Sequence, residues 1–170
     1  MNKKLAFLLY SWGTTSLFIA IIFWLSTVPY LADSNDIYEQ SIKTLYRITL
    51  YGVLFLLVYR SLLATFRTTV KRLSKWHSKA EKADDTEFVL IIETLLVVIA
   101  ITISSLIAVV DEFIQIYVDG RFPDPVDILI SIMAILLAAI LVYSTPSIGE
   151  LEIALKHKFF DNFFKKRGIK

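Results

Sequence analysis

The sequence predicts an all-α membrane protein with four transmembrane helices and a C-terminal amphipathic helix at the membrane surface. Apolar residue types make up 56% of the 170 residues, and the mean hydropathy is +0.62. The apolar residues gather in four runs long enough to cross a bilayer, which takes about 20 residues of helix. Polar, charged segments separate the runs, as they do in multi-pass membrane proteins.

Residues 5–25 form the first predicted span, because no charged residue interrupts this run after Lys3 and Lys4. The hydrophobic part of a cleaved signal peptide is usually only about 7–15 residues long, and no convincing cleavage site follows Leu25. We therefore predict an uncleaved span that begins on the cytoplasmic side.

The second predicted span, residues 45–64, contains Arg47 and Arg60, which lie about 20 Å apart along a helix axis. Two interpretations stay open. In the first, both arginines anchor the span by extending toward opposite membrane faces. In the second, Arg47 enters an acidic cluster and Arg60 meets Glu93.

Residues 88–110 and 126–143 form the third and fourth predicted spans, after a hydrophilic connector over residues 67–87. Asp111 opens a hairpin between these two spans, where Gly120 supplies a tight reversal. The membrane domain then covers residues 1–145. Residues 146–170 form a basic tail with apolar residues at a spacing of four, which predicts a helix lying in the membrane plane.

The distribution of basic residues predicts the orientation. Two basic residues lie at the N-terminus, six in the connector and six in the tail, whereas the loops on the other side hold only Lys43 and Arg121, with Arg47 at the edge. The positive-inside rule places both termini and the connector in the cytoplasm. The hairpin after the third span is then extracytoplasmic, at the outer face of a plasma membrane.

Polar residues of this hairpin form the candidate site, because carboxylates, an amide and a guanidinium gather at one membrane face. They are Asp111, Glu112, Gln115, Arg121 and Asp127, with Arg47 as a further candidate. A helix places Asp111 and Gln115 on one face. Three interpretations stay open: a structural set in which Arg121 pairs with Asp111 or Glu112 and Asp127 caps the fourth span, a divalent-cation site, and acid–base catalysis by Asp111 or Glu112.

Composition excludes several other classes of site. The chain has no cysteine, so it has no disulfide and no thiolate ligand or nucleophile. Its two histidines lie in basic segments rather than beside carboxylates. We predict no resident metal, no cofactor and no nucleic-acid partner.

The run Asp-Glu-Phe-Ile-Gln at residues 111–115, the Gly-Arg pair ending at Arg121 and Asp127 at the head of a span resemble the D-E-x-x-Q…G-R…D signature of the VanZ-like family. This family consists of small multi-span membrane proteins named after a teicoplanin-resistance accessory protein. The end of the first span at residues 23–26, and Tyr51 and Gly52 in the second, also resemble the family. The family often has histidine where this chain has Arg47. It also often has Asn, Gly and Gly where this chain has Ser131, Ala134 and Ala138.

The resemblance implies a protein of the bacterial plasma membrane that lowers susceptibility to teicoplanin-type glycopeptides. Its implied partners are the lipid bilayer and either a glycopeptide antibiotic or a cell-envelope precursor lipid at the outer face. Two alternatives stay open: a membrane enzyme acting on a lipid-linked envelope substrate, with Asp111 or Glu112 as acid or base, and a purely structural membrane partner subunit.

Overall fold

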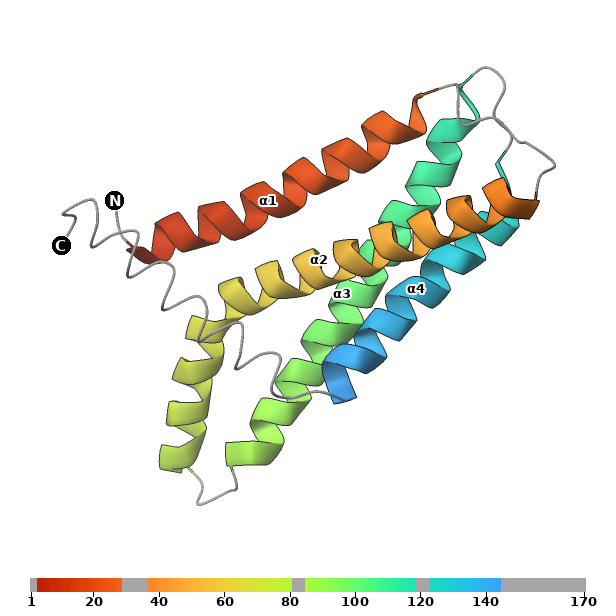
Figure 1. The fold of residues 1–170 in the computed structure, drawn as a ribbon. Helices are drawn as coiled ribbons and strands as arrows, with labels where there is room; N and C mark the ends of the chain where they lie inside the picture. The colour runs from red at the N-terminus through yellow and green to blue at the C-terminus, as the bar shows by residue number, and fades with distance from the viewer. Residues whose placement is uncertain (1–2, 29–36, 81–84, 119–122, 145–170) are drawn as a thin grey trace. The chain divides into compact units, whose positions relative to one another are not determined.

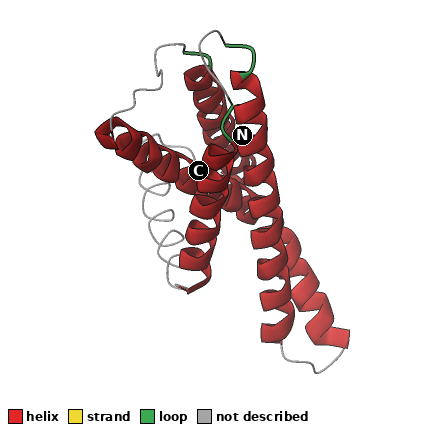
Figure 2. Cartoon of the chain, turned by 90° about the vertical axis from the view of Figure 1, so that its right-hand side faces the viewer, coloured by secondary structure: helices red, strands yellow, loops and turns green. Residues whose placement is uncertain are grey.

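The computed structural model describes residues 3–28, 37–80, 85–118 and 123–144, which contain four helices (Figures 1 and 2). Helix α1 spans Lys3–Ser26, α2 spans Ile37–Ala80, α3 spans Asp85–Gln115 and α4 spans Pro125–Ser144. Strands are absent from the described residues. The predicted helix over residues 146–170, and with it the predicted domain boundary, lies outside them.

Each helix contains one stretch that is long and apolar enough to cross a membrane, as expected of a multi-pass membrane protein. These stretches are Leu5–Ser26, Gln40–Phe66, Ile91–Gln115 and Pro125–Ser144. They agree with the four predicted spans to within a few residues at most ends. An apolar run of this length can satisfy its backbone hydrogen bonds within a lipid bilayer only as a helix, so its composition is sufficient to predict it.

Two helices extend further than the sequence pattern predicts. Helix α2 continues through most of the hydrophilic connector to Ala80, and α3 continues through the start of the predicted hairpin to Gln115. Asp111, which opens the predicted hairpin, lies within α3, as the predicted shared helix face of Asp111 and Gln115 requires. Helical hydrogen bonding does not depend on apolar side chains, so hydropathy marks the end of a span and not the end of its helix.

Helix α2 packs against both α1 and α3. Its buried face carries Tyr51, Leu54, Phe55 and Val58, each at most 1% exposed. The small side chains Ala100, Ser104 and Ala108 repeat at a spacing of four on the buried face of α3. Small residues let neighbouring helices approach closely, which is a common means of association between helices in lipid.

A line of hydroxyl groups joins α1 to α2 in the half of the helices away from Ser26. Thr15 Oγ1 lies 2.9 Å from Ser61 Oγ, and it also donates to the Leu57 carbonyl oxygen at 3.1 Å. Ser61 Oγ donates to the Ser11 carbonyl oxygen at 3.0 Å. These hydroxyl groups satisfy one another and the backbone, so they add specific polar contacts to the interface between α1 and α2.

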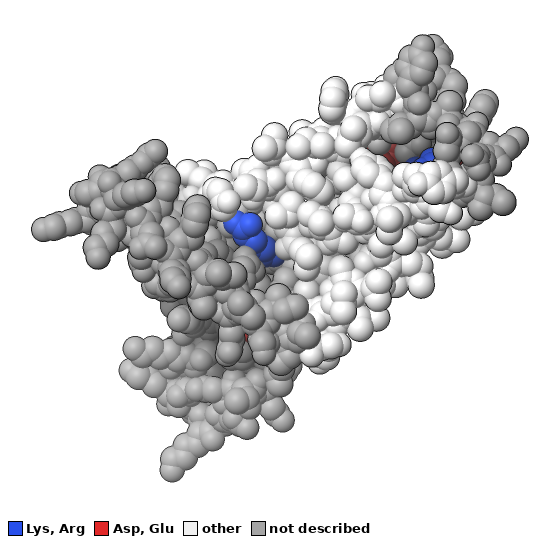
Figure 3. All heavy atoms as spheres, viewed as in Figure 1, with Lys and Arg blue, Asp and Glu red and all other residues white. Residues whose placement is uncertain are grey.

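The outward-facing surface is apolar over most of its described area. Leu17, Leu95, Met133 and Ile140 are each more than half exposed. Figure 3 shows that the described part of this face is almost entirely free of charged groups. A soluble protein rarely exposes apolar surface on this scale, whereas a membrane protein presents it to lipid.

Arg60 lies within the second candidate span, with its guanidinium carbon 5.2 Å from the centre of the Tyr10 ring. A guanidinium at this distance is attracted to the ring face. The contact shown for Arg60 is with an aromatic ring of α1, and the predicted pairing of Arg60 with Glu93 stays a prediction.

Candidate functional site: a buried cluster around Arg47

The last two turns of α3 supply three buried polar side chains. Asp111 is 4% exposed, Glu112 is 2% exposed and Gln115 is 6% exposed, whereas Phe113 between them is 59% exposed. Spacings of three and four residues place the three polar groups on one face of the helix. The end of α3 therefore directs these polar groups inward and the apolar side chain of Phe113 outward.

Asp111 joins α3 to the two preceding helices. Its Oδ2 atom accepts a hydrogen bond of 2.7 Å from the Tyr51 hydroxyl group of α2. Its Oδ1 atom accepts a hydrogen bond from the Ser26 hydroxyl group at the end of α1. Both donors are neutral, so they hold the carboxylate in place without neutralising its charge.

Arg47 bridges two carboxylates from different helices. Its Nη1 atom lies 3.1 Å from Glu112 Oε2 of α3, and its Nη2 atom lies 2.7 Å from Asp127 Oδ2 of α4. The Arg47 and Glu112 side chains are 9% and 3% exposed, and that of Asp127 is 15% exposed. The planar guanidinium presents donors in fixed directions, which suits it to hold two carboxylates at once.

Glu112 is the most heavily bonded member of the group. Besides the contact with Arg47, its Oε2 atom accepts a hydrogen bond of 3.2 Å from Gln115 Nε2. Its Oε1 atom accepts one of 2.8 Å from the backbone N–H of Asp124, just before α4. A single carboxylate thus fixes the start of α4 against the end of α3.

Asp124 caps the first turn of α4. Its Oδ1 atom accepts a hydrogen bond of 2.9 Å from the backbone N–H of Val126, and Pro125 occupies the first helical position. Aspartate before the first turn followed by proline is a common way to begin a helix. The side chain shown as the cap is therefore that of Asp124, whereas Asp127, the cap expected from the sequence, bonds to Arg47.

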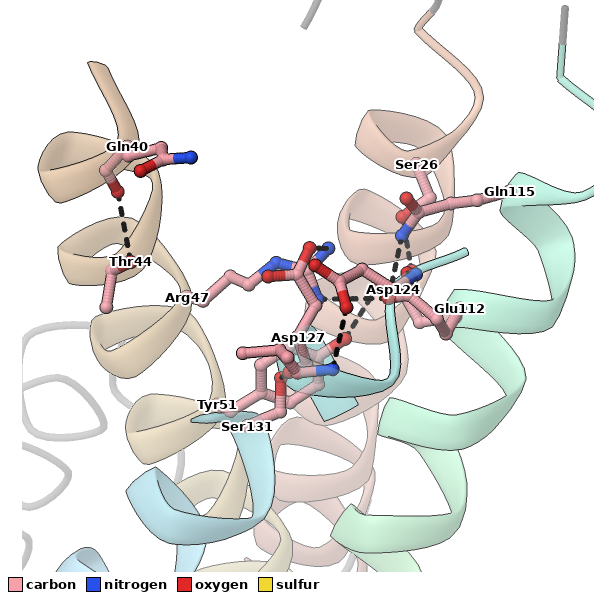
Figure 4. A network of polar contacts seen from close by, with 12 residues as sticks. Ser26, Gln40, Thr44, Arg47, Tyr51, Glu112, Gln115, Asp124, Asp127 and Ser131 are labelled. Carbon is pink, nitrogen blue, oxygen red and sulfur yellow. Dashed lines mark hydrogen bonds and ion pairs between the residues drawn. The ribbon is translucent and has the colours of Figure 1, made fainter. Parts of the chain in front are cut away.

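We call this set of side chains the Arg47 cluster (Figure 4). Its members are Ser26, Arg47, Tyr51, Asp111, Glu112, Gln115, Asp124 and Asp127. The cluster brings together five of the six candidate site residues, namely Asp111, Glu112, Gln115, Asp127 and Arg47. The sixth, Arg121, lies outside the described residues, so its predicted pairing with Asp111 or Glu112 stays a prediction. The cation shown beside Glu112 is Arg47.

The other members of the cluster, Ser26, Tyr51 and Asp124, differ in how far they could be predicted from the sequence. Ser26 and Tyr51 belong to the segments that resemble the VanZ-like family, but no spacing rule pointed to Asp111 as their common partner. The role of Asp124 as a helix cap was predictable, because the pair Asp124-Pro125 before an apolar run indicates the start of a helix. Within the whole cluster, Ser26 comes from α1, Arg47 and Tyr51 from α2, and Asp111 from α3. Contacts between separate helices cannot be read from spacing along the sequence.

The Arg47 cluster contains more acidic than basic groups. The guanidinium of Arg47 contacts Glu112 and Asp127, the charge of Lys43 also acts on Asp127, and Asp111 bonds to the hydroxyl groups of Ser26 and Tyr51. Hydrogen-bond donors and carboxylates in one buried place are suited to recognising a polar group or to holding helices together. Across the described ranges, no three histidine, cysteine or acidic side chains are arranged to hold a metal ion.

Comparison of the chain with protein-family models, curated proteins and solved structures gave no match.

Proposed function

We propose that this chain is a membrane protein of the VanZ-like type that acts at the outer face of the bacterial plasma membrane. In this proposal the Arg47 cluster lowers susceptibility to teicoplanin-type glycopeptides, by recognising either the antibiotic or a cell-envelope precursor lipid. The observation that carries the proposal is the meeting of Asp111, Glu112, Gln115 and Asp127, the described residues of the resembling motif, at one buried place.

The order of charges supports the proposed orientation. The cluster is built from the ends of candidate spans: Ser26 ends the first, and Asp111 to Gln115 end the third. The loops next to these ends are poor in lysine and arginine, whereas the connector after the second span is rich in both. Basic loops stay in the cytoplasm, so the cluster belongs to the outer face and both termini to the inner face.

The burial of several charged groups in one place supports a role in recognition. Arg47 forms ion pairs with Glu112 and Asp127, while the Asp111 carboxylate accepts hydrogen bonds from the neutral hydroxyl groups of Ser26 and Tyr51. Burying charged groups is costly near lipid, and such groups commonly mark functional sites in membrane proteins.

A structural role is the second candidate, and the number of bonds to Glu112 favours it. Its two oxygen atoms accept from Arg47, Gln115 and the Asp124 backbone. A carboxylate bonded in this way is suited to fixing the end of α3 against α2 and α4. In this case the chain would serve as a partner subunit, and the cluster would hold its helices together.

The susceptibility of a bacterial host that expresses the chain separates the two candidates. We expect expression to raise the teicoplanin concentration that the host tolerates, and Asp111→Asn to remove this gain at unchanged membrane abundance. Asparagine keeps the size of the side chain and removes its charge. The matched control is Thr49→Val, since Thr49 is exposed on α2 and donates only to the Leu45 carbonyl oxygen of its own helix in the contacts shown.

Two results would decide against recognition by the cluster. Full tolerance in the Asp111→Asn variant at normal abundance would refute it directly. A loss of tolerance that follows a loss of folded protein in the membrane, and that is reversed when expression is raised, would support the structural role instead.

A further inference from the structure

One side of α2 is exposed through the middle of its candidate span. Val53 is 37% exposed, Leu56 is 43% exposed and Thr49 is exposed as well. Tyr51 and Phe55, on the other side of the helix, are at most 1% exposed. With 3.6 residues per turn, Thr49, Val53 and Leu56 lie within an arc of about 60°. We call this arc the outward side of α2, since the other helices leave it uncovered.

Three basic residues continue the outward side where the apolar run of α2 ends, and we call them the basic stripe. They are Arg60, Arg67 and Lys71. The helix is continuous as far as Ala80, so its register places all three within the same arc of about 60°. Arg60 lies about 9 Å before Phe66, which ends the candidate span. Arg67 is the next residue, and Lys71 follows about one turn later. The basic stripe therefore crosses the edge of the span on the side that faces lipid.

The contact between Arg60 and Tyr10 indicates which way the guanidinium of Arg60 points. Arg60 is partly exposed, and its guanidinium carbon lies 5.2 Å from the centre of the Tyr10 ring. Helices α1 and α2 run antiparallel, and Ser61 of α2 bonds to the Ser11 carbonyl oxygen of α1. Tyr10 precedes Ser11, and helical side chains lean toward the N-terminus of their helix, so the Tyr10 ring lies on the connector side of this bond. The guanidinium of Arg60 is therefore directed toward the edge of the span.

We propose that the basic stripe binds the phosphate group of an anionic phospholipid in the inner leaflet. A guanidinium can bind a phosphate through two parallel hydrogen bonds, and basic residues directly after a transmembrane helix attract anionic lipids. Arginine within a span extends to the headgroup level, which brings Arg60 toward the level of Arg67. The phosphate belongs to a lipid rather than to a soluble anion, because the stripe continues the outward side of α2. This inference rests on the proposed orientation of the chain, and it concerns the membrane face opposite the Arg47 cluster.

Lipid retention by the full-length protein tests the inference. The protein is purified from bilayers that contain equal amounts of phosphatidylglycerol and phosphatidylcholine with the same acyl chains, and the retained lipids are measured by native mass spectrometry. We expect phosphatidylglycerol to be retained in excess. The double variant Arg67→Gln, Lys71→Gln should lower the retained ratio of phosphatidylglycerol to phosphatidylcholine by about fivefold for each lost cation.

The double variant Arg72→Gln, Lys79→Gln is the matched control. It removes one arginine and one lysine from the same helix, but at positions about 100–120° around the helix from Arg60. It should retain the two lipids in the ratio of the unmodified protein, and circular dichroism should show the same helix content in both double variants. Asp111→Asn should also keep the ratio, so a failure of the cluster proposal can be told apart from a failure of this one.

Three results would overturn the inference. The first is equal retention of the two lipids by the unmodified protein. The second is an equal fall of the ratio in both double variants, because attraction that follows net charge alone does not depend on the side of the helix. The third is displacement of phosphatidylglycerol by excess inorganic phosphate, which would show a site for a soluble anion.

Discussion

Replacement of Arg47 by methionine is the most informative perturbation of the cluster. Methionine has a similar length and suits an apolar environment, but it leaves Glu112 and Asp127 without the guanidinium that both contact. The side chains of Arg47 and Glu112 are at least nine-tenths buried. The variant therefore exposes the cost of buried negative charge rather than the loss of packing.

The expected loss of stability is large because an unpaired charge stays behind. Removing one partner of a buried ion pair commonly costs about 3–5 kcal/mol. Glu112 keeps its bonds from Gln115 and from the Asp124 backbone, so we expect Arg47→Met to lie near the lower end, at about 3 kcal/mol. The triple variant Arg47→Met, Glu112→Gln, Asp127→Asn should recover most of this loss, because it leaves no unpaired carboxylate at these positions.

Unfolding of the purified protein in bicelles by a denaturing detergent, followed by circular dichroism, measures these free energies. Thr49→Ala serves as the control for an exposed change on α2 and should stay within about 0.5 kcal/mol of the unmodified protein. The reasoning is refuted if Arg47→Met is as stable as this control, or if the triple variant is less stable than Arg47→Met alone.

Three further substitutions test individual contacts by the same unfolding measurement. Tyr51→Phe keeps the ring but removes the hydroxyl donor to Asp111, and should cost about 1.5–3 kcal/mol, as expected for a hydrogen bond to a charged group. Asp124→Ala removes the cap of α4 and should cost about 1 kcal/mol. Thr15→Val removes the hydroxyl contact with Ser61, and should cost about 0.6 kcal/mol and at most about 1.7 kcal/mol. A value near zero for any of them would mean that the contact does not stabilise the folded protein in lipid.

The sequence was sufficient to predict the four helices because the bilayer restricts the possible structures so strongly. A run of about 20 apolar residues leaves helix as the only structure that satisfies its own backbone in lipid. The helix ends were less predictable. Ala80 and Gln115 lie beyond the apolar runs, where helix formation depends on local propensity and tertiary contacts rather than on hydropathy.

The site was predictable where its residues are close in sequence. Asp111, Glu112 and Gln115 share a helix face by spacing alone. The partners of Asp111 were not predictable from spacing, since Tyr51 lies 60 residues away and Ser26 lies 85 residues away. Such contacts depend on how each helix is rotated about its axis, which only the packing of the folded protein determines.

The partners of Arg47 were likewise not predictable from the sequence. Its place near the end of an apolar run allowed two interpretations, an anchor in the headgroup region or a member of the acidic cluster. The spacing could not choose between them, because both require an arginine at the edge of a span. The structure places Arg47 between Glu112 and Asp127, so its role follows from which helices lie beside α2.

The central claim is that Arg47 of α2 holds Asp127 of α4, and a double-mutant cycle tests it most directly. The four proteins are the unmodified chain, Arg47→Met, Asp127→Asn and the double variant, each unfolded in bicelles. We predict that the two substitutions interact by at least about 1 kcal/mol, with the double variant more stable than the sum of the single losses implies. Single losses that add within about 0.3–0.5 kcal/mol would contradict the claim, because independent sites behave in that way.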